Sequence, residues 1–124
     1  MEKVIPSSLL ARIKAQPPEV IKKVTRCIPE EVLADPSVTV ADLAMGGGDY
    51  LAAVLKLRLD AGVPREEAVK TLYGYESNIV YVNHALWKKD LQGANIAILK
   101  PSDLQKFNMK FDVIIGNPPY PGLQ

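Results

Sequence analysis

The sequence predicts an α/β protein in which a parallel β-sheet of about four strands is flanked by helices. Short apolar stretches rich in β-branched residues alternate along the chain with segments of helical periodicity. In addition, the glycine run Gly46-Gly47-Gly48 follows the first apolar stretch and precedes a helical segment. Glycines at such a turn let a ligand approach the backbone, and the helix start offers free N–H groups.

The first 36 residues are expected to form helices that pack on the rest of the chain. A short helix is predicted after Ser7 or Ser8, which suit its cap. A second helix begins at Pro18 and is stopped by Pro29. Residues 30–36 are expected to be a connector. The apolar face of the second helix, which is expected to enter the core, carries Val20, Ile21, Val24, Cys27 and Ile28.

Strands and helices then alternate up to the end of the chain. The predicted strands are residues 37–44, 71–75, 95–99 and 111–115, each short, apolar and bounded by turn residues. The predicted helices are residues 49–61, with Gly62 as the C-terminal cap, 64–70 and 78–91. The positions expected to face inward from the first and last of these helices are Leu51, Val54, Leu55, Leu59, Ile79, Val82, Leu86 and Trp87.

Composition limits the possible functions. Of the 124 residues, 15 are Lys or Arg and 14 are Asp or Glu, a net charge of +1, which excludes DNA binding through a broad basic surface. Cys27 is the only cysteine, so no intrachain disulfide is possible and a reducing cytoplasm is expected. Neither Cys27 nor His84 has neighbours at ligand spacing, so no metal site is predicted. No signal peptide or membrane span is predicted either.

The most informative segment is Asn117-Pro118-Pro119-Tyr120, which directly follows the last predicted strand. Open α/β sheets bind ligands at the carboxyl ends of their strands. Two prolines fix φ and lack N–H groups, so the carbonyls of this loop are presented as acceptors. Asn117, the Pro118 carbonyl and the Tyr120 ring are suited to hold a flat group that bears an amine. The alternative is a simple Pro-Pro turn without a site.

Acidic residues end the predicted strands on the same side of the sheet. Asp42 ends the first strand, just before the glycines, and Glu76 follows the second. A carboxylate at the second position can accept hydrogen bonds from both ribose hydroxyls of a cofactor, although a solvated loop carboxylate is the alternative. Asp49, at the start of the next helix, would repel a phosphate but could face an ammonium group.

Three segments, residues 16–21, 41–51 and 117–120, resemble motifs of amino-methyltransferases that use S-adenosylmethionine, most closely adenine-N6 DNA methyltransferases of restriction-modification systems. The sequence departs from the usual motifs at three positions. Gln16 stands where the family usually has Thr, Leu43 where it usually has Pro, and Met45 where it usually has Cys or Phe. The resemblance implies a Rossmann-like class I methyltransferase fold. It implies a catalytic loop of Asn117, Pro118, Pro119 and Tyr120, and cofactor contacts from Gln16, Asp42, Ala44, Met45, Gly46, Gly48, Glu76, Asp103 and Leu104.

The activity that the resemblance implies is methyl transfer to the N6 amine of adenine in DNA. RNA amine methyltransferases and protein-glutamine methyltransferases share the loop and stay open as alternatives, as does a remnant that binds cofactor or a partner without turnover. Residues 1–36 are expected to form the helical part and residues 37–124 the cofactor-binding and catalytic-loop half of the domain. The resemblance leads us to expect that a target-recognition domain is not part of these residues and that DNA binds through a missing C-terminal region. The edge of the fourth strand, which a fifth strand covers in the family, is expected to pair in a homodimer or with a complementing chain.

Overall fold

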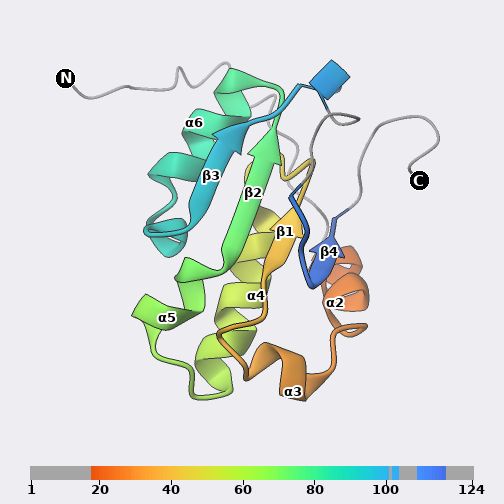
Figure 1. Cartoon of the computed structure of the whole chain (residues 1–124), viewed down its shortest axis with the longest axis vertical. Helices are drawn as coiled ribbons and strands as arrows, with labels where there is room; N and C mark the ends of the chain where they lie inside the picture. The colour runs from red at the N-terminus through yellow and green to blue at the C-terminus, as the bar shows by residue number, and fades with distance from the viewer. Residues whose placement is uncertain (1–17, 101, 104–108, 117–124) are drawn as a thin grey trace.

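The structure is a computed structural model that describes residues 18–100, 102–103 and 109–116. The predicted helix near residues 7–13 lies outside the described residues. In chain order the elements are α2 (Pro18–Thr25), α3 (Glu30–Leu33), β1 (Val40–Asp42), α4 (Asp49–Asp60), α5 (Arg65–Lys70), β2 (Leu72–Glu76), α6 (Ile79–Trp87), the 3-10 turn η1 (Lys89–Leu91), β3 (Asn95–Ile98) and β4 (Val113–Ile115) (Figure 1).

The four strands form one parallel sheet in the order β3-β2-β1-β4. β1 lies in the middle, where Val40 is level with Leu72 of β2 and with Val113 of β4. β1 is shorter than the predicted strand, because the Ala44 N–H turns back to the Asp42 side chain and ends the extended stretch. The prediction of an α/β protein with a parallel sheet is confirmed.

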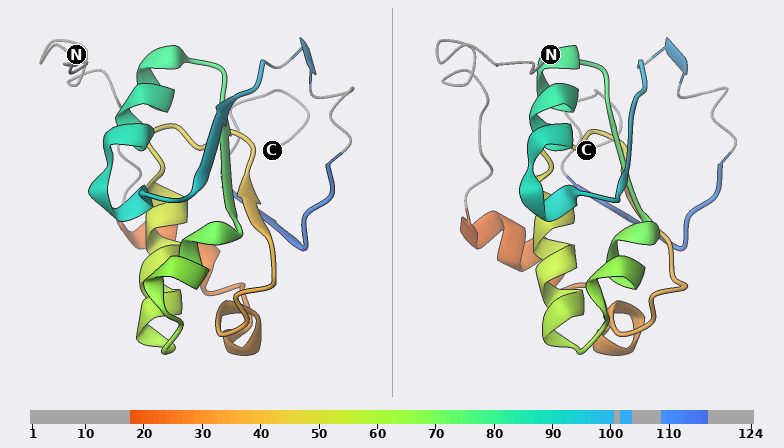
Figure 2. Two further views of the ribbon diagram at one scale, coloured as in Figure 1. Left: turned by 60° about the vertical axis from the view of Figure 1, so that its left-hand side comes forward. Right: turned by 90° about the vertical axis from the view of Figure 1, so that its left-hand side faces the viewer.

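The described helices all lie on one face of the sheet (Figure 2). Leu51, Val54 and Leu55 of α4 are buried against the strands, and the connector predicted for residues 30–36 is in part the helix α3, which buries Leu33. The core that these elements share consists of Ile28, Leu33, Val40, Met45, Leu51, Val54, Leu55, Val63, Ala68, Val69, Leu72, Val82, Ala85 and Leu91. This layer supports the backbone of β1 and β2, whose carboxyl ends carry the candidate site.

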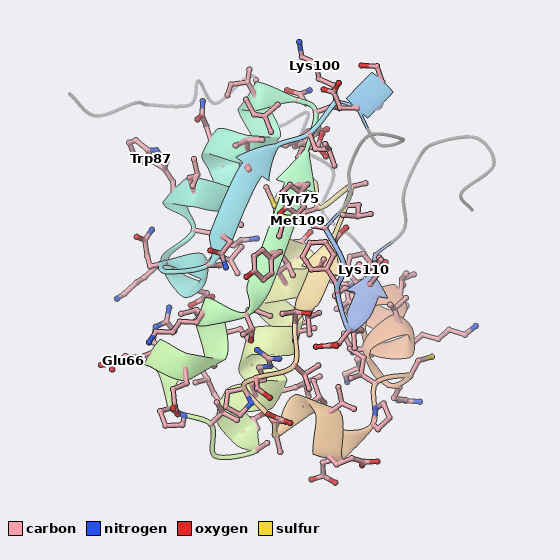
Figure 3. All side chains as sticks on the ribbon, viewed as in Figure 1. Glu66, Tyr75, Trp87, Lys100, Met109 and Lys110 are labelled. Atoms are coloured by element: carbon pink, nitrogen blue, oxygen red, sulfur yellow. The ribbon has the colours of Figure 1, made fainter. Side chains whose placement is uncertain are left out.

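The opposite face of β2 contacts the segment that leads into β4. The Phe111 ring centroid lies 5.1 Å from that of Tyr73 and 6.2 Å from that of Tyr75. The Tyr75 hydroxyl also lies 3.6 Å from the Met109 sulfur, a contact visible in front of β2 in Figure 3. These aromatic contacts hold the approach to β4 against the sheet.

The amino end of β4 is fixed to β1 by a reciprocal pair of side chains. Thr39 donates from its backbone N–H and from its hydroxyl to Asp112 Oδ2, at 2.9 and 3.2 Å. In return the Asp112 N–H donates to Thr39 Oγ1 at 2.9 Å. The two strands then run level with each other, which brings Gly116 to the carboxyl end of β1.

Two predictions of buried positions are wrong for reasons of helix geometry. Cys27 is exposed because α2 ends at Thr25, whose hydroxyl donates to the Ile21 carbonyl at 2.8 Å, and Thr25 is buried instead. In α4 the buried face continues from Leu51 to Arg58, seven residues or about two helical turns further on. Arg58 is therefore fully buried, and the neighbouring Leu59 is 38% exposed.

The Arg58 guanidinium donates to carbonyl and hydroxyl oxygens rather than to a carboxylate. Its Nη1 donates to the Ala68 carbonyl at 2.9 Å and to Thr71 Oγ1 at 2.7 Å, and its Nη2 donates to the Val38 carbonyl at 2.6 Å. Burial lowers the pKa of this guanidinium, which the more distant charge of Asp35 partly offsets. Arg58 therefore joins α4, α5 and the amino ends of β1 and β2.

The predicted helix 78–91 ends early, at Trp87, and only part of its expected inner face is buried. Val82 is buried as predicted, whereas Ile79, Leu86 and Trp87 are each about half exposed, and Trp87 points away from α6 in Figure 3. The helix stops because Lys88 adopts an extended backbone. The chain then forms η1, which turns Leu91 into the core.

Among the described residues, none of the helices combines the length and apolar character needed to cross a membrane.

Candidate functional site

The candidate site lies where β1 and β2 end beside the glycine turn. Asp42 and Glu76 are the last residues of the two strands, and both side chains are buried. The Met45 N–H donates to the Tyr75 carbonyl at 2.9 Å, which continues the pairing of the two strands into the turn. Two carboxyl groups, predicted from separate motifs, are thus brought to one edge of the sheet.

Glu76 connects the glycine turn to the start of α6. Its Oε1 accepts the Gly46 N–H at 3.1 Å, and its Oε2 accepts the Asn78 N–H at 2.8 Å and the Ser77 hydroxyl at 3.3 Å. Backbone donors hold this carboxylate in one orientation, and each oxygen keeps acceptor capacity for a further donor. Glu76 is therefore an anchored acceptor rather than the solvated loop carboxylate that the sequence also allowed.

The glycine turn needs glycine for two different reasons. Gly46 has a φ of +56°, and a Cβ there would meet nothing within 4 Å among the described residues, which leave the space in front of it open. Gly48 has a φ of +90° at the N-cap of α4, and a Cβ there would lie 2.5 Å from Leu91 Cδ1. The open position can admit a ligand, whereas the crowded one packs the turn against η1.

Asp49, the first residue of α4, forms an ion pair with Lys88, which directly follows α6. Lys88 Nζ lies 3.0 Å from Asp49 Oδ1 and 3.1 Å from the Gly47 carbonyl oxygen, with both charged side chains about one quarter exposed. By the sequence Asp49 could face a cofactor ammonium, and here its charge is paired with Lys88. Lys88 directly follows α6 with an extended backbone, and its side chain reaches the glycine turn.

Asp42 is the most constrained group of the site. Only 1% of its surface is exposed, its Oδ1 accepts the Ala44 N–H at 3.1 Å, and its Oδ2 has no hydrogen-bond partner among the described residues. Burial raises the pKa of Asp42 to about 7, helped by the negative charge of Glu76 and opposed by the Ala44 N–H. A buried carboxyl that is half protonated near neutrality is a marker of a functional site.

The segment that precedes the Asn-Pro-Pro-Tyr loop packs directly on this carboxyl. Gly116, with a φ of +118°, is so close that a Cβ on it would lie 2.5 Å from Asp42 Oδ1 and 3.0 Å from Oδ2. Glycine is required here both for the backbone angle and for the contact. The end of β1 and Gly116, the residue directly before the predicted catalytic loop, therefore touch at Asp42.

The remaining predicted site residues differ in how the structure places them. Met45 is buried in the core, with its sulfur over Gly74, so only its backbone borders the turn. Asp103 is exposed in a short turn after β3, with its N–H donating to the Lys100 carbonyl at 2.9 Å. Those that lie outside the described residues, and whose roles stay predictions, are Gln16, Leu104, Asn117, Pro118, Pro119 and Tyr120.

Two residues of the site were not predicted. Gly116 had a signal, because a glycine between a strand and a polar loop often marks a close approach of the backbone. Lys88 had none, because nothing in its neighbourhood distinguishes it from other surface lysines. Among the described residues no group of three or more His, Cys, Asp or Glu side chains is placed to hold a metal ion.

A glycine turn after the central strand of a parallel sheet, with an acidic residue ending the next strand, defines a Rossmann-like cofactor-binding fold. The sequence model of the family described as Eco57I restriction-modification methylase matches residues 53–124, more than half of the chain. The chain belongs to this family, and it is a methyltransferase of the restriction-modification type. No curated protein matches the chain. The match includes Glu76, Asp103 and the Asn-Pro-Pro-Tyr loop, and it begins after the glycine turn.

Proposed function

We propose that this protein transfers a methyl group from S-adenosylmethionine to the N6 amine of adenine in DNA. The observation that carries the proposal is the contact between Asp42 and Gly116, which joins the predicted cofactor edge to the start of the predicted catalytic loop. Methyl transfer needs the two substrates side by side, and this juxtaposition supports such an arrangement. Membership of a restriction-modification methylase family favours DNA over RNA or a protein glutamine as the substrate.

The residues present fit S-adenosylmethionine better than a dinucleotide. Within the described part of the chain nothing would lie within 4 Å of a Cβ on Gly46, and the acidic group Glu76 ends the neighbouring strand beside it. Glu76 keeps acceptor capacity for the ribose hydroxyls, and the exposed Asp103 is available to accept the amine of the cofactor's adenine. Carboxylates at this edge suit a cation bearing hydroxyl groups and disfavour a pyrophosphate.

Methyl transfer is expected to depend on how the target amine is positioned and on the polar groups that accept its hydrogens. Bound S-adenosylmethionine supplies a methyl group that is already activated on a sulfonium sulfur. The Asn117 side-chain oxygen and the Pro118 carbonyl would accept the two hydrogens of the target amine and stabilise the positive charge that develops on it. Tyr120 would stack on an adenine flipped out of the duplex. Pro119 would keep the loop rigid through its fixed φ.

We expect the protein to bind S-adenosylhomocysteine at the glycine turn, and we expect Glu76→Ala to weaken binding by about tenfold to a hundredfold. The mutation removes the ribose acceptor and also frees the Gly46 N–H, and each lost charge-assisted hydrogen bond is worth about 1.5–3 kcal/mol. Titration calorimetry measures the effect. Glu66→Ala, on the exposed surface of α5, is the matched control. Equal affinities for wild type and Glu76→Ala would place the cofactor elsewhere.

We also propose that the free edge of β4 pairs with another strand, in a homodimer or with a complementing chain. Within the described residues β4 pairs with β1 alone, and its central residue Ile114 is 60% exposed. A groove of about 560 Å³ runs beside it, lined by residues 113–116 and by Lys23, Val24, Cys27, Ile28 and Pro29. An apolar strand edge of this kind promotes pairing. DNA would bind through regions outside the described residues.

The proposal predicts that the apparent mass of the chain rises with concentration in light scattering. Ile114→Lys places a charge in the middle of the edge and is expected to shift the population towards monomer. Ile98→Lys, on the opposite edge strand β3, is the matched control because Ile98 is 48% exposed. Wild type that stays monomeric over the whole concentration range would rule out pairing at β4.

A further inference from the structure

The Asp42 carboxyl group contacts two segments of the chain, the glycine turn and the backbone at Gly116. Its Oδ1 accepts the Ala44 N–H and so holds the glycine turn. Gly116 packs against the same carboxyl group, since a Cβ on it would lie 2.5 Å from Oδ1 and 3.0 Å from Oδ2. Because the side chain is 1% exposed and wedged between these two segments, a shift of either one must move the other.

One oxygen of the Asp42 carboxyl group has unused capacity to accept a hydrogen bond. Its Oδ2 is buried and has no partner among the described residues, although a buried carboxyl oxygen normally accepts a hydrogen bond. After Gly116 the chain continues with Asn117, which carries N–H donors, and with Pro118 and Pro119, which have none. A group that bound only the cofactor would not need Gly116 packed against it.

We propose that Asp42 is a positioning residue for methyl transfer: its carboxylate fixes the backbone at Gly116 and thereby sets the point from which the Asn117–Tyr120 loop leaves the sheet. This inference rests on the proposed function, but it gives Asp42 a different role from that of a cofactor ligand. Loss of a positioning residue lowers kcat and leaves cofactor affinity nearly unchanged. Loss of a cofactor ligand raises Kd.

Protonation of Asp42 gives a second signature. Burial raises the pKa of Asp42 to about 7. Among the described residues the ionisable groups that face it are Glu76 from β2 and Tyr50 from α4, and the uncharged Gly116 follows β4. Since the ionised form is the better acceptor, the rate should rise with pH and reach a plateau above about 7. A variant with no titrating group at this position should lose that dependence.

The test compares Asp42→Asn with Asp112→Asn in the full chain, with labelled S-adenosylmethionine and DNA at saturation. Asp42→Asn keeps the shape of the side chain and an acceptor for the Ala44 N–H, whereas Asp112 holds the far end of the same strand pair. We expect Asp42→Asn to lower kcat on the order of a hundredfold, the scale expected for a misplaced reacting group, and to flatten the pH profile. The Kd of S-adenosylhomocysteine should change by less than about threefold, and Asp112→Asn should alter none of these quantities.

Two outcomes would overturn the inference: an unchanged kcat, or a Kd that rises as much as kcat falls, which makes Asp42 a cofactor ligand. If the chain methylates no substrate, the proposed function fails, and a second measurement decides the inference. The Gly116 amide resonance should then titrate with a midpoint of about 7 in wild type and not in Asp42→Asn. A Gly116 resonance that is the same at pH 5 and pH 9 would show that Asp42 does not act on this backbone.

Discussion

Replacing Asn117 by alanine is expected to lower the rate of methyl transfer by about a hundredfold or more, the usual cost of losing one preorganised polar contact in a transition state. The lone pair of an adenine amine is delocalised into the ring, so the amine is a weak nucleophile. An acceptor for one of its hydrogens favours the pyramidal nitrogen and the developing charge. Because the proposed role of Asn117 is on the target amine and not on the cofactor, the affinity for S-adenosylhomocysteine should stay within about threefold of wild type. Labelled methyl transfer at saturating substrates measures the rate.

A matched asparagine controls for loss of stability. Asn95 donates through its side chain to the carbonyls of Lys70 and Leu72, near the amino ends of β2 and β3, away from the site. Asn95→Ala should therefore leave kcat nearly unchanged. RNA and protein glutamine substrates belong in the same assay. Transfer to a protein glutamine and not to DNA would make the protein a protein-glutamine methyltransferase. Full activity of Asn117→Ala would show that Asn117 has no part in the mechanism.

Replacing Arg58 by alanine is expected to reduce the free energy of unfolding by about 3 kcal/mol or more. The mutation leaves the Val38 and Ala68 carbonyls and the Thr71 hydroxyl without their charged donor, and each buried group left unpaired costs about 1–3 kcal/mol. It also opens a cavity beneath α4, because Arg58 is fully buried. Such a loss is a large share of the stability of a domain of this size. Urea denaturation gives the value.

Arg65 provides the comparison for this stability effect. It also donates to two backbone carbonyls, those of Lys89 and Asp90, but its side chain is exposed. Water can replace those bonds, so Arg65→Ala should cost less than about 1 kcal/mol. Equal losses for the two variants would mean that burial does not make Arg58 important. Arg58→Met, which restores part of the volume but none of the donors, separates the cavity from the hydrogen bonds.

Local patterns were enough to predict the four strands, the helices that alternate with them and the parallel arrangement, but not α3, which lies where a connector was predicted. The strands are short apolar runs and α4 has a regular apolar face, so their existence follows from neighbouring residues alone. The errors at buried positions have two causes. Leu59 was expected inside because it is apolar, whereas the helical spacing from Leu51 places Arg58 there. Cys27 was expected inside because it falls on the apolar helical spacing, but α2 ends at Thr25, whose hydroxyl donates to the Ile21 carbonyl.

By itself, the sequence determined that this chain has a parallel sheet with a glycine turn, acidic strand ends and an Asn-Pro-Pro-Tyr loop, because each of these is a feature of consecutive residues. Only the tertiary structure decided which of them meet. Asp42 contacts Gly116, and Asp49 pairs with Lys88, since β4 returns beside β1 and α6 ends next to the turn. The burial that raises the pKa of Asp42 arises in the same way, because desolvation depends on every segment packed around a group.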